Sequence, residues 1–128
     1  MSEPRFLTLE QVKRLHRRVI ELFGGTHGLR DPLLLEGAVI HPRNVYYYAQ
    51  GDLFDVAAAY AFHIAQAQGF LDGNKRTGIA AALSFLEGNG VALPASTDRF
   101  HEAMIAVAER RMDKTQLASL FRQVAVGE

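Results

Sequence analysis

The chain has 128 residues, 48% of them hydrophobic, and its 14 basic side chains are balanced by 14 acidic ones. This length and composition indicate a single domain with one hydrophobic core and argue against a disordered chain. The zero net charge argues against non-specific nucleic-acid binding, and the absence of cysteine excludes disulfides and thiolate catalysis.

The N-terminal segment MSEPRFLTLEQ is mixed and polar, unlike the basic and then apolar start of a signal peptide. No apolar run approaches the ~18 residues that a membrane span requires. We therefore expect a cytoplasmic protein without membrane association.

The first helix is predicted to begin after Thr8. Thr8 and Gln11 have the spacing of a capping box, and hydrophobic residues then recur at steps of three and four as far as Leu22. Gly24 and Gly25 end the helix. Three basic residues lie off this stripe and are interpreted as a solvated face: Lys13, Arg14 and Arg17.

A second helix is predicted to start at Asp31 and Pro32, because aspartate suits the N-cap and proline suits the first helical position. It is expected to stop before Pro42, since the residue preceding proline disfavours the helical conformation. The stretch 44–51 contains three consecutive tyrosines and no helical cap, so it predicts a short extended flap.

Four further helices follow in the chain. The segment 52–68 is rich in alanine, which allows close packing, and 75–87 is apolar almost all round, so both are expected at the centre. Ser96 and Asp113 mark the starts of the last two helices. The sequence therefore predicts one all-α domain, residues 1–128, with about six helices and room for a small β-hairpin flap.

Polar residues cluster at the N-terminus of the predicted central helix, residues 75–87. Gly73 and Asn74 stand where the first turn exposes unpaired N–H groups, which favour anions. Lys75 and Arg76 add positive charge where the helix dipole prefers carboxylates, which indicates an external anion. Asp72 beside them is suited to magnesium bound through substrate phosphates, so the group points to a Mg-nucleotide. An ordinary capped helix with two exposed basic residues is the alternative from spacing alone.

The stretch GFLDGNKRTG resembles the signature loop of the Fic superfamily, whose pattern is His-x-Phe-x-(Asp/Glu)-Gly-Asn-x-Arg. The flanking segments FLTLEQV, GLRDPLLLEGAV, YYYAQGDLFDVAAAYAFHIA and FLEGNGV match as well, so the resemblance covers nearly the whole chain. Within the superfamily, the pattern and length are similar to the death-on-curing (Doc) toxins, which are small all-helical proteins paired with an antitoxin.

The resemblance implies a role for each motif residue. Phe70 would be buried and would pin the loop to the core, and Asp72 would hold magnesium. Gly73 and Asn74 would form the phosphate-facing turn, and Arg76 would bind phosphate.

The resemblance also favours one reaction over another. Lysine at position 75 is typical of Doc proteins, whereas many Fic adenylyltransferases have glycine at this position. Ile79 stands at the position of the second arginine of those enzymes. The implied chemistry is therefore phosphoryl transfer from ATP, with Mg²⁺, to a protein hydroxyl. The known target in the family is a threonine of elongation factor Tu, and the result is arrested translation. Fic-type AMP transfer is the alternative reaction.

The chain departs from the family at Gln68, which stands in the position of the motif histidine. That histidine takes the proton of the target hydroxyl, and a glutamine amide cannot accept a proton near neutral pH. Loss of a positioned base typically costs roughly 10²–10⁴ in rate. The expected catalytic set is thus Gln68, Asp72, Lys75 and Arg76, with transfer impaired.

Three accounts of Gln68 remain open at this point. The first account is an engineered inactivation, and the second is a natural variant that keeps nucleotide or partner binding. The third is an active site that relies on positioning and charge. A module that binds an anion or peptide without catalysis is the competing class of function.

Another histidine could in principle replace the base. His63 should point away from Gln68 on the same helix and is interpreted as a packing residue. His16 flanks the apolar stripe of the first helix, so packing is expected there too. His27 and His41 are expected in surface loops, and the sequence does not place His101.

Inhibition is expected to come from a separate antitoxin that lays a helix in a groove beside the site. Some family members carry an inhibitory Ser/Thr-x-x-x-Glu-Gly/Asn segment in the same chain. Ser84 to Gly88 has the wrong spacing for that pattern and lies in the central helix.

Overall fold

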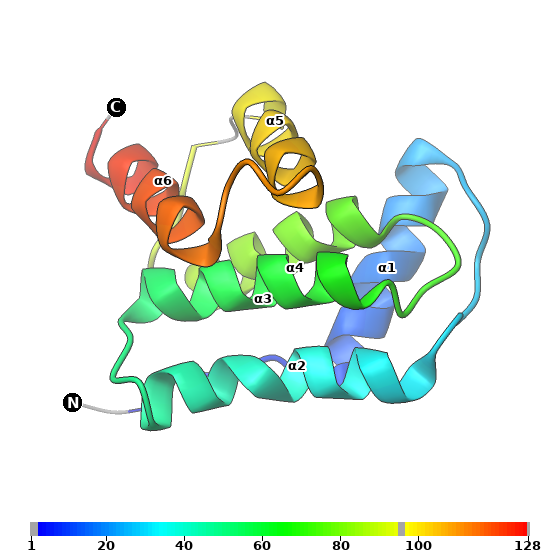
Figure 1. Ribbon diagram of the computed structural model, residues 1–128, viewed down its shortest axis with the longest axis horizontal. Helices are drawn as coiled ribbons and strands as arrows, with labels where there is room; N and C mark the ends of the chain where they lie inside the picture. The colour runs from blue at the N-terminus through cyan, green and yellow to red at the C-terminus, as the bar shows by residue number, and fades with distance from the viewer. Residues whose placement is uncertain (1–2, 95–96, 128) are drawn as a thin grey trace.

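The structure is a computed structural model that describes residues 3–94 and 97–127. These residues form six helices joined by short loops (Figure 1). The helices are α1 (Leu9–Phe23), α2 (Pro32–Tyr47), α3 (Leu53–Ala67), α4 (Asn74–Gly88), α5 (Thr97–Ala108) and α6 (Lys114–Gly127). The predicted all-α fold class is confirmed.

Local capping explains where several helices begin. Thr8 and Gln11 form the predicted reciprocal capping box of α1. Asp31 accepts a hydrogen bond from the Leu34 N–H, and Pro32 occupies the first turn of α2 as predicted. Asp52 and Asp55 cap α3 reciprocally. Asp113 and Gln116 exchange the same pair of bonds before α6.

The predicted stop before Pro42 and the extended flap at 44–51 are both wrong. Helix α2 continues through Pro42 to Tyr47, and the β pairing in the described residues is a single bridge between Leu29 and Phe70. Pro42 is buried, and Tyr46 packs edge-on against Phe6 with ring centroids 5.9 Å apart. Tertiary packing thus overrides the β propensity of the tyrosines and the cost of a helical proline.

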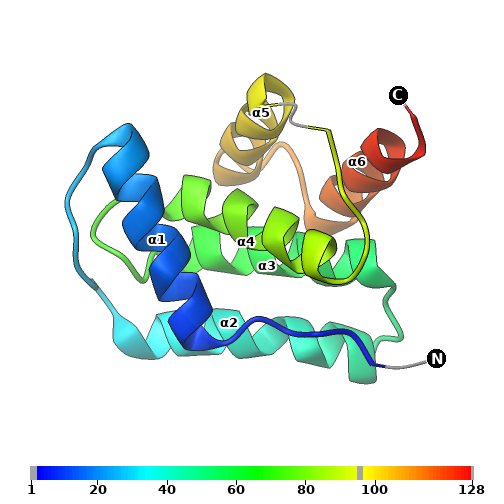
Figure 2. The ribbon, with the colours of Figure 1, turned by 180° about the vertical axis from the view of Figure 1, so that it is seen from behind.

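Helices α3 and α4 lie side by side at the centre of the molecule. Helix α2 covers one side of α3, and α5 and α6 cover the opposite side (Figure 1). Helix α1 crosses α4 on the far face, as the reverse view shows (Figure 2). The site residues between α3 and α4 therefore lie at one end of the central pair.

The contact between α3 and α4 is built from small residues. Ala57, Ala58 and Ala61 are fully buried, and a Cβ added at Gly78 would come within 2.7 Å of the Ala61 carbonyl oxygen. The backbones therefore approach so closely that only glycine fits at position 78 without movement.

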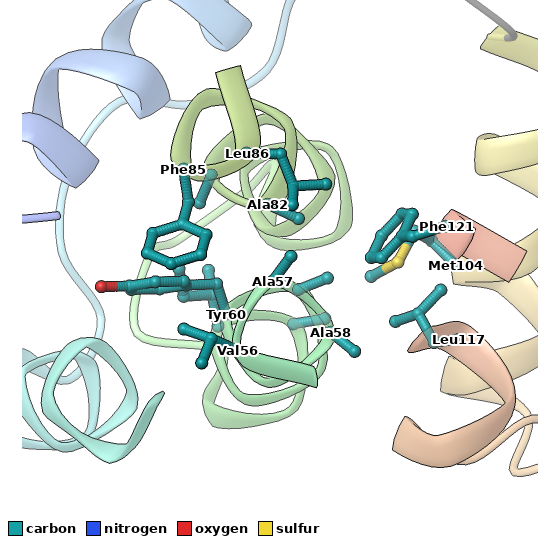
Figure 3. Packing of buried hydrophobic residues seen from close by; sticks show 14 of the residues in the cluster. Val56, Ala57, Ala58, Tyr60, Ala82, Phe85, Leu86, Met104, Leu117 and Phe121 are labelled. Carbon is teal, nitrogen blue, oxygen red and sulfur yellow. The ribbon is translucent and has the colours of Figure 1, made fainter. Parts of the chain in front are cut away.

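Larger side chains fill the space on either side of the alanines (Figure 3). Tyr60 and Phe85 pack together on one side, with ring centroids 5.3 Å apart. Met104, Leu117 and Phe121, from α5 and α6, occupy the other side. The Tyr60 hydroxyl accepts a 2.9 Å hydrogen bond from the Leu7 N–H, which ties the N-terminal segment to the core.

Over residues 3–94 and 97–127, no helix combines the length and the hydrophobicity needed to cross a bilayer.

Candidate functional site

The polar residues predicted from the sequence lie in residues 68–73, the motif loop, and in the first turn of α4. Gln68 ends α3 in the left-handed conformation, with φ 50° and ψ 46°, and its side chain is exposed. Gly73 precedes α4, also in the left-handed region, with φ 76°. The chain therefore reverses between two left-handed residues, and the non-glycine Gln68 must be held there by its surroundings.

Residues 24–31, the clamp segment, supply backbone bonds to the motif loop. The Leu71 N–H donates to the Gly28 carbonyl at 3.0 Å, and the Gly69 carbonyl accepts from the N–H groups of Arg30 and Asp31. Gly69 is needed at this contact, because a Cβ there would lie 2.7 Å from the Leu35 Cβ.

The Arg30 side chain reinforces the same contact. Its Nε donates to the Gln68 carbonyl at 2.6 Å, and its Nη2 donates to the Ala67 carbonyl at 3.1 Å. A cation at a helix C-terminus also complements the negative end of the dipole. The role of Arg30 was not predictable from the sequence, because Arg30 and the carbonyl groups it binds are far apart in the chain and only the fold brings them together.

Phe70 and His16 fix the inner side of the motif loop. Phe70 is buried, and its ring stacks on His16 with centroids 3.7 Å apart and planes 4° from parallel. His16 Nε2 lies 2.8 Å from the Asp72 carbonyl oxygen. Burial lowers the pKa of His16, so a neutral ring donates this hydrogen bond at pH 7. The packing role expected for His16 is confirmed.

The Asn74 side chain bonds back to the loop. Its Oδ1 accepts from the Phe70 N–H at 3.1 Å, and its Nδ2 donates to the Phe70 carbonyl at 3.0 Å. Both polar atoms of the Asn74 amide therefore bond to the backbone of the motif loop and help to fix its conformation. No side chain in the described residues caps α4, so its first N–H groups remain available to an anion.

Asp72 presents its carboxylate at the junction of the two segments. Oδ2 accepts from the Thr26 N–H at 3.2 Å, and Oδ1 accepts from the Gly73 N–H at 3.1 Å. The residue is exposed, so lone pairs of both oxygens remain open to solvent. One such carboxylate fits magnesium, which takes few protein oxygens and completes its shell with water and phosphate. Among the residues that the structure describes, no three carboxylate, imidazole or thiol side chains form a metal cage.

Lys75 and Arg76 line one side of a hollow between α1, α4 and α5. The hollow has a volume of about 500 Å³ and an apolar wall that includes Leu22, Phe23 and Ile79. The Arg76 guanidinium lies 4.3 Å from the centre of the Phe23 ring. Both cations thus line this hollow, whereas Gln68, Asp72 and Asn74 are not among its lining residues.

The remaining histidines are placed as follows. His63 packs against His41, with ring centroids 4.0 Å apart, and its Nε2 lies 2.9 Å from Lys114 Nζ. The packing role expected for His63 is confirmed. His27 lies in the exposed α1–α2 loop as predicted, but His41 lies within α2, because the helix does not stop before Pro42. His101 lines the same hollow as Lys75 and Arg76.

Two comparisons show which known proteins the chain resembles in sequence. Residues 6–86 match the sequence model of the Fic/DOC family. Toxin Doc of Mycolicibacterium smegmatis is 42% identical over 101 residues, which cover 76% of this chain and 78% of that protein. Protein kinase doc of Escherichia phage P1 is 38% identical over 88 residues, which cover 68% of this chain and 70% of that protein.

Proposed function

Because the chain belongs to the Fic/DOC family, we propose that it is a Doc-like toxin built to transfer a phosphoryl group from ATP to a protein hydroxyl. One observation carries the proposal: Lys75 and Arg76 belong to the uncapped first turn of α4, and both line the same hollow. Two cations and free N–H groups form a cradle for the phosphates of a nucleotide. We expect the target of the family, a threonine of elongation factor Tu, and arrested translation as the result.

The phosphate groups would lie against the first turn of α4. The Arg76 guanidinium can donate two parallel hydrogen bonds to phosphate oxygens, and Lys75 adds a second charge. Asp72 would hold Mg²⁺, which neutralises charge on the phosphates when bound. The clamp segment and Asn74 keep the loop in one shape, so that these groups need little reorganisation.

In the transfer step, the target hydroxyl oxygen attacks the γ-phosphorus and the bond to the β–γ bridging oxygen breaks, so ADP leaves. The proton of the hydroxyl must go to a base. Gln68 stands at that position, and its amide cannot take the proton. We therefore expect nucleotide binding with slow transfer.

Phosphoryl transfer is favoured over AMP transfer by two observations. A relative carries the name Protein kinase doc. Ile79 contributes an apolar side chain to the wall of the hollow, at the position of the second arginine in many Fic adenylyltransferases. AMP transfer is the second candidate, because the same cradle would hold the α-phosphate if the nucleotide were shifted.

Two neighbouring hollows share Leu15, Arg18 and Ser84, and we call them together the α1–α4 groove. An antitoxin helix is expected to bind in this groove. One hollow is the apolar one beside Lys75 and Arg76. The other, of about 640 Å³, is lined by four arginines: Arg5, Arg14, Arg17 and Arg18. A partner helix with an apolar face and acidic residues matches both parts. Arg14 and Arg17 of α1, which the sequence predicted only as part of a solvated face, therefore also line this groove.

The test compares the chain with Gln68 and its Gln68→His variant, using ATP labelled at the γ- or the α-phosphate and elongation factor Tu as acceptor. We expect label from the γ-phosphate alone, and a rate increase of about 10²–10⁴ in Gln68→His. Equal ATP affinity of the two proteins, measured by calorimetry with Mg²⁺, would separate binding from chemistry. Label from the α-phosphate would favour AMP transfer, and no ATP binding by either protein would overturn the proposal.

A further inference from the structure

Helix α2 has an apolar face that no other helix of the described chain covers. The face turns away from α3, at the edge of the molecule (Figure 1). We define it as the α2 stripe: Leu33, Gly37, Ile40 and Tyr47. Leu33 is 78% exposed, Ile40 55% and Tyr47 47%. These residues recur at helical spacing over about 21 Å at ~1.5 Å per residue; exposed Asn44 lies between Ile40 and Tyr47, and the Tyr47 ring also packs on Phe6.

The stripe does not line the Lys75 and Arg76 hollow, and its N-terminal end follows the clamp segment. The Lys75 and Arg76 hollow is formed by α1, α4 and α5, whereas α2 packs on the other side of α3. Several large apolar side chains aligned on one exposed helix indicate an interaction surface more strongly than scattered ones would.

Gly37 gives this face the shape of a helix-packing surface. A Cβ added at Gly37 would meet nothing within 4 Å, so the glycine is not required by packing inside the chain. Glycine inside a helix is destabilising relative to alanine. Between Leu33 and Ile40 it leaves a notch into which a side chain of an opposing helix can fit.

The charges beside the stripe indicate which opposing helix fits this surface. Glu36 and Arg43 are both exposed and lie on the same flank of the stripe, one near each end. Ile40 is midway between Leu33 and Tyr47. If a second copy of α2 lies antiparallel about a two-fold axis at Ile40, Leu33 of each copy faces Tyr47 of the other. The same operation brings Glu36 beside Arg43 of the other copy twice.

We propose that the α2 stripe is the interface of a symmetric dimer of this chain. The interface is isologous, since each copy presents the same apolar line and the same acidic and basic ends. It is only one helix long, so it falls at or below about 1,200 Å² in total, the size of weak and transient association. The zero net charge of the chain adds no general repulsion between copies.

Sedimentation velocity of the full chain at roughly 10–500 µM should show a monomer–dimer equilibrium, as expected for an interface of this size. Ile40→Arg should lower the association constant at least ~10-fold, because it places two like charges at the two-fold axis. Leu71→Arg is the matched control, since Leu71 is 53% exposed and lies on the motif loop. Far-UV circular dichroism verifies that each variant is folded.

Charge exchange tests the antiparallel pairing itself. Glu36→Arg alone and Arg43→Glu alone should each weaken the dimer, and the double variant should restore it, because the two charges exchange places across the axis. The chain has no cysteine, so Ile40→Cys introduces a unique thiol. Mild oxidation should link two copies through Ile40→Cys faster than through Leu71→Cys.

Three results would overturn the proposal. The first is a monomer over the whole concentration range, with no faster cross-linking of Ile40→Cys. The second is a dimer that Ile40→Arg leaves unchanged. The third is a monomer that loses binding of a co-expressed antitoxin in Ile40→Arg, which would assign the stripe to that partner. None of these measurements depends on transferase activity.

Discussion

The contact between α3 and α4 and the motif loop that joins them are stabilised by different means. The helix contact is apolar and fully buried, and it depends on the small size of residues such as Ala61 and Gly78. The loop exposes Gln68, Leu71 and Asp72, and it depends on hydrogen bonds with Asn74 and the clamp segment, including Arg30. Substitutions in the first region should therefore change stability, and substitutions of groups that the loop presents should change activity.

The largest effect is expected at Arg76, in the Gln68→His background. Arg76→Ala should lower the phosphotransfer rate by about 10²–10³, because a preorganised charge at the transferring group is lost. The free energy of unfolding should change by less than about 0.5 kcal/mol, since Arg76 is exposed. Transfer assays and urea unfolding give both quantities. Arg111→Ala, at an exposed arginine paired with Glu109, is the control. An unchanged rate in Arg76→Ala would contradict the assignment.

Gly78 tests the buried contact. Gly78→Val should destabilise the fold by about 3 kcal/mol, because the new side chain collides with the α3 backbone near Ala61. Gly88→Ala, in the same helix, is the matched control, because a Cβ there meets nothing within 4 Å. It should be neutral or stabilising by up to ~1 kcal/mol. Equal unfolding midpoints in urea for the two variants would show that the helices are not closely packed.

Acid should weaken the packed region through His63. Burial, with Lys114 and His41 nearby, lowers the pKa of His63 from 6.5 to about 4. The unfolded chain therefore binds the proton more readily than the folded chain. The contribution of His63 to the free energy of unfolding is complete above pH 6.5 and is lost as the pH falls towards 4. After allowance for partial exposure, about 1–2 kcal/mol should be lost over this range.

The measurement for His63 is urea unfolding at several pH values. His63→Gln should flatten the curve of unfolding free energy against pH between pH 6.5 and 4, relative to the unsubstituted chain. His27→Gln is the control, because His27 is exposed in the α1–α2 loop. The same slope in all three proteins would remove His63 as the cause.

Arg30 sharpens the comparison, because it acts on the position of the site without belonging to the phosphate cradle. In the Gln68→His background, Arg30→Ala should lower kcat about tenfold, since residue 68 loses the bonds that hold its left-handed backbone. The KM for ATP should stay within about twofold, and the fold should lose only ~1 kcal/mol. Arg30→Lys should recover part of kcat. A rise in KM with constant kcat would instead indicate a direct contact with the nucleotide.

The sequence predicted the parts of this structure that depend on nearby residues. Thr8 with Gln11 and Asp31 with Pro32 predicted helix starts from adjacent positions, and both are confirmed. The helix through Pro42 was not predicted, because its stability comes from aromatic packing with the N-terminal segment.

The candidate site shows the same division. The motif predicted the site residues at the start of α4, and of these only Lys75 and Arg76 line the hollow. The contacts that shape the loop were not predictable, because Arg30 and His16 reach it from distant parts of the chain. Asn74 was assigned to phosphate by resemblance, whereas its side chain binds the loop backbone.

The Tyr60 phenol, enclosed beside Phe85 and bonded to the Leu7 N–H, sets an alkaline limit for the whole fold. Burial raises the pKa of Tyr60 to about 12, so the folded chain keeps its proton after an unfolded chain has lost it, from about pH 10 upward. Tyrosinate formation at this ring would place an anion among apolar side chains, and the hydrogen bond from the Leu7 N–H would offset only part of that cost. The chain has four tyrosines and no tryptophan, so the last step in ultraviolet absorbance should coincide with alkaline unfolding.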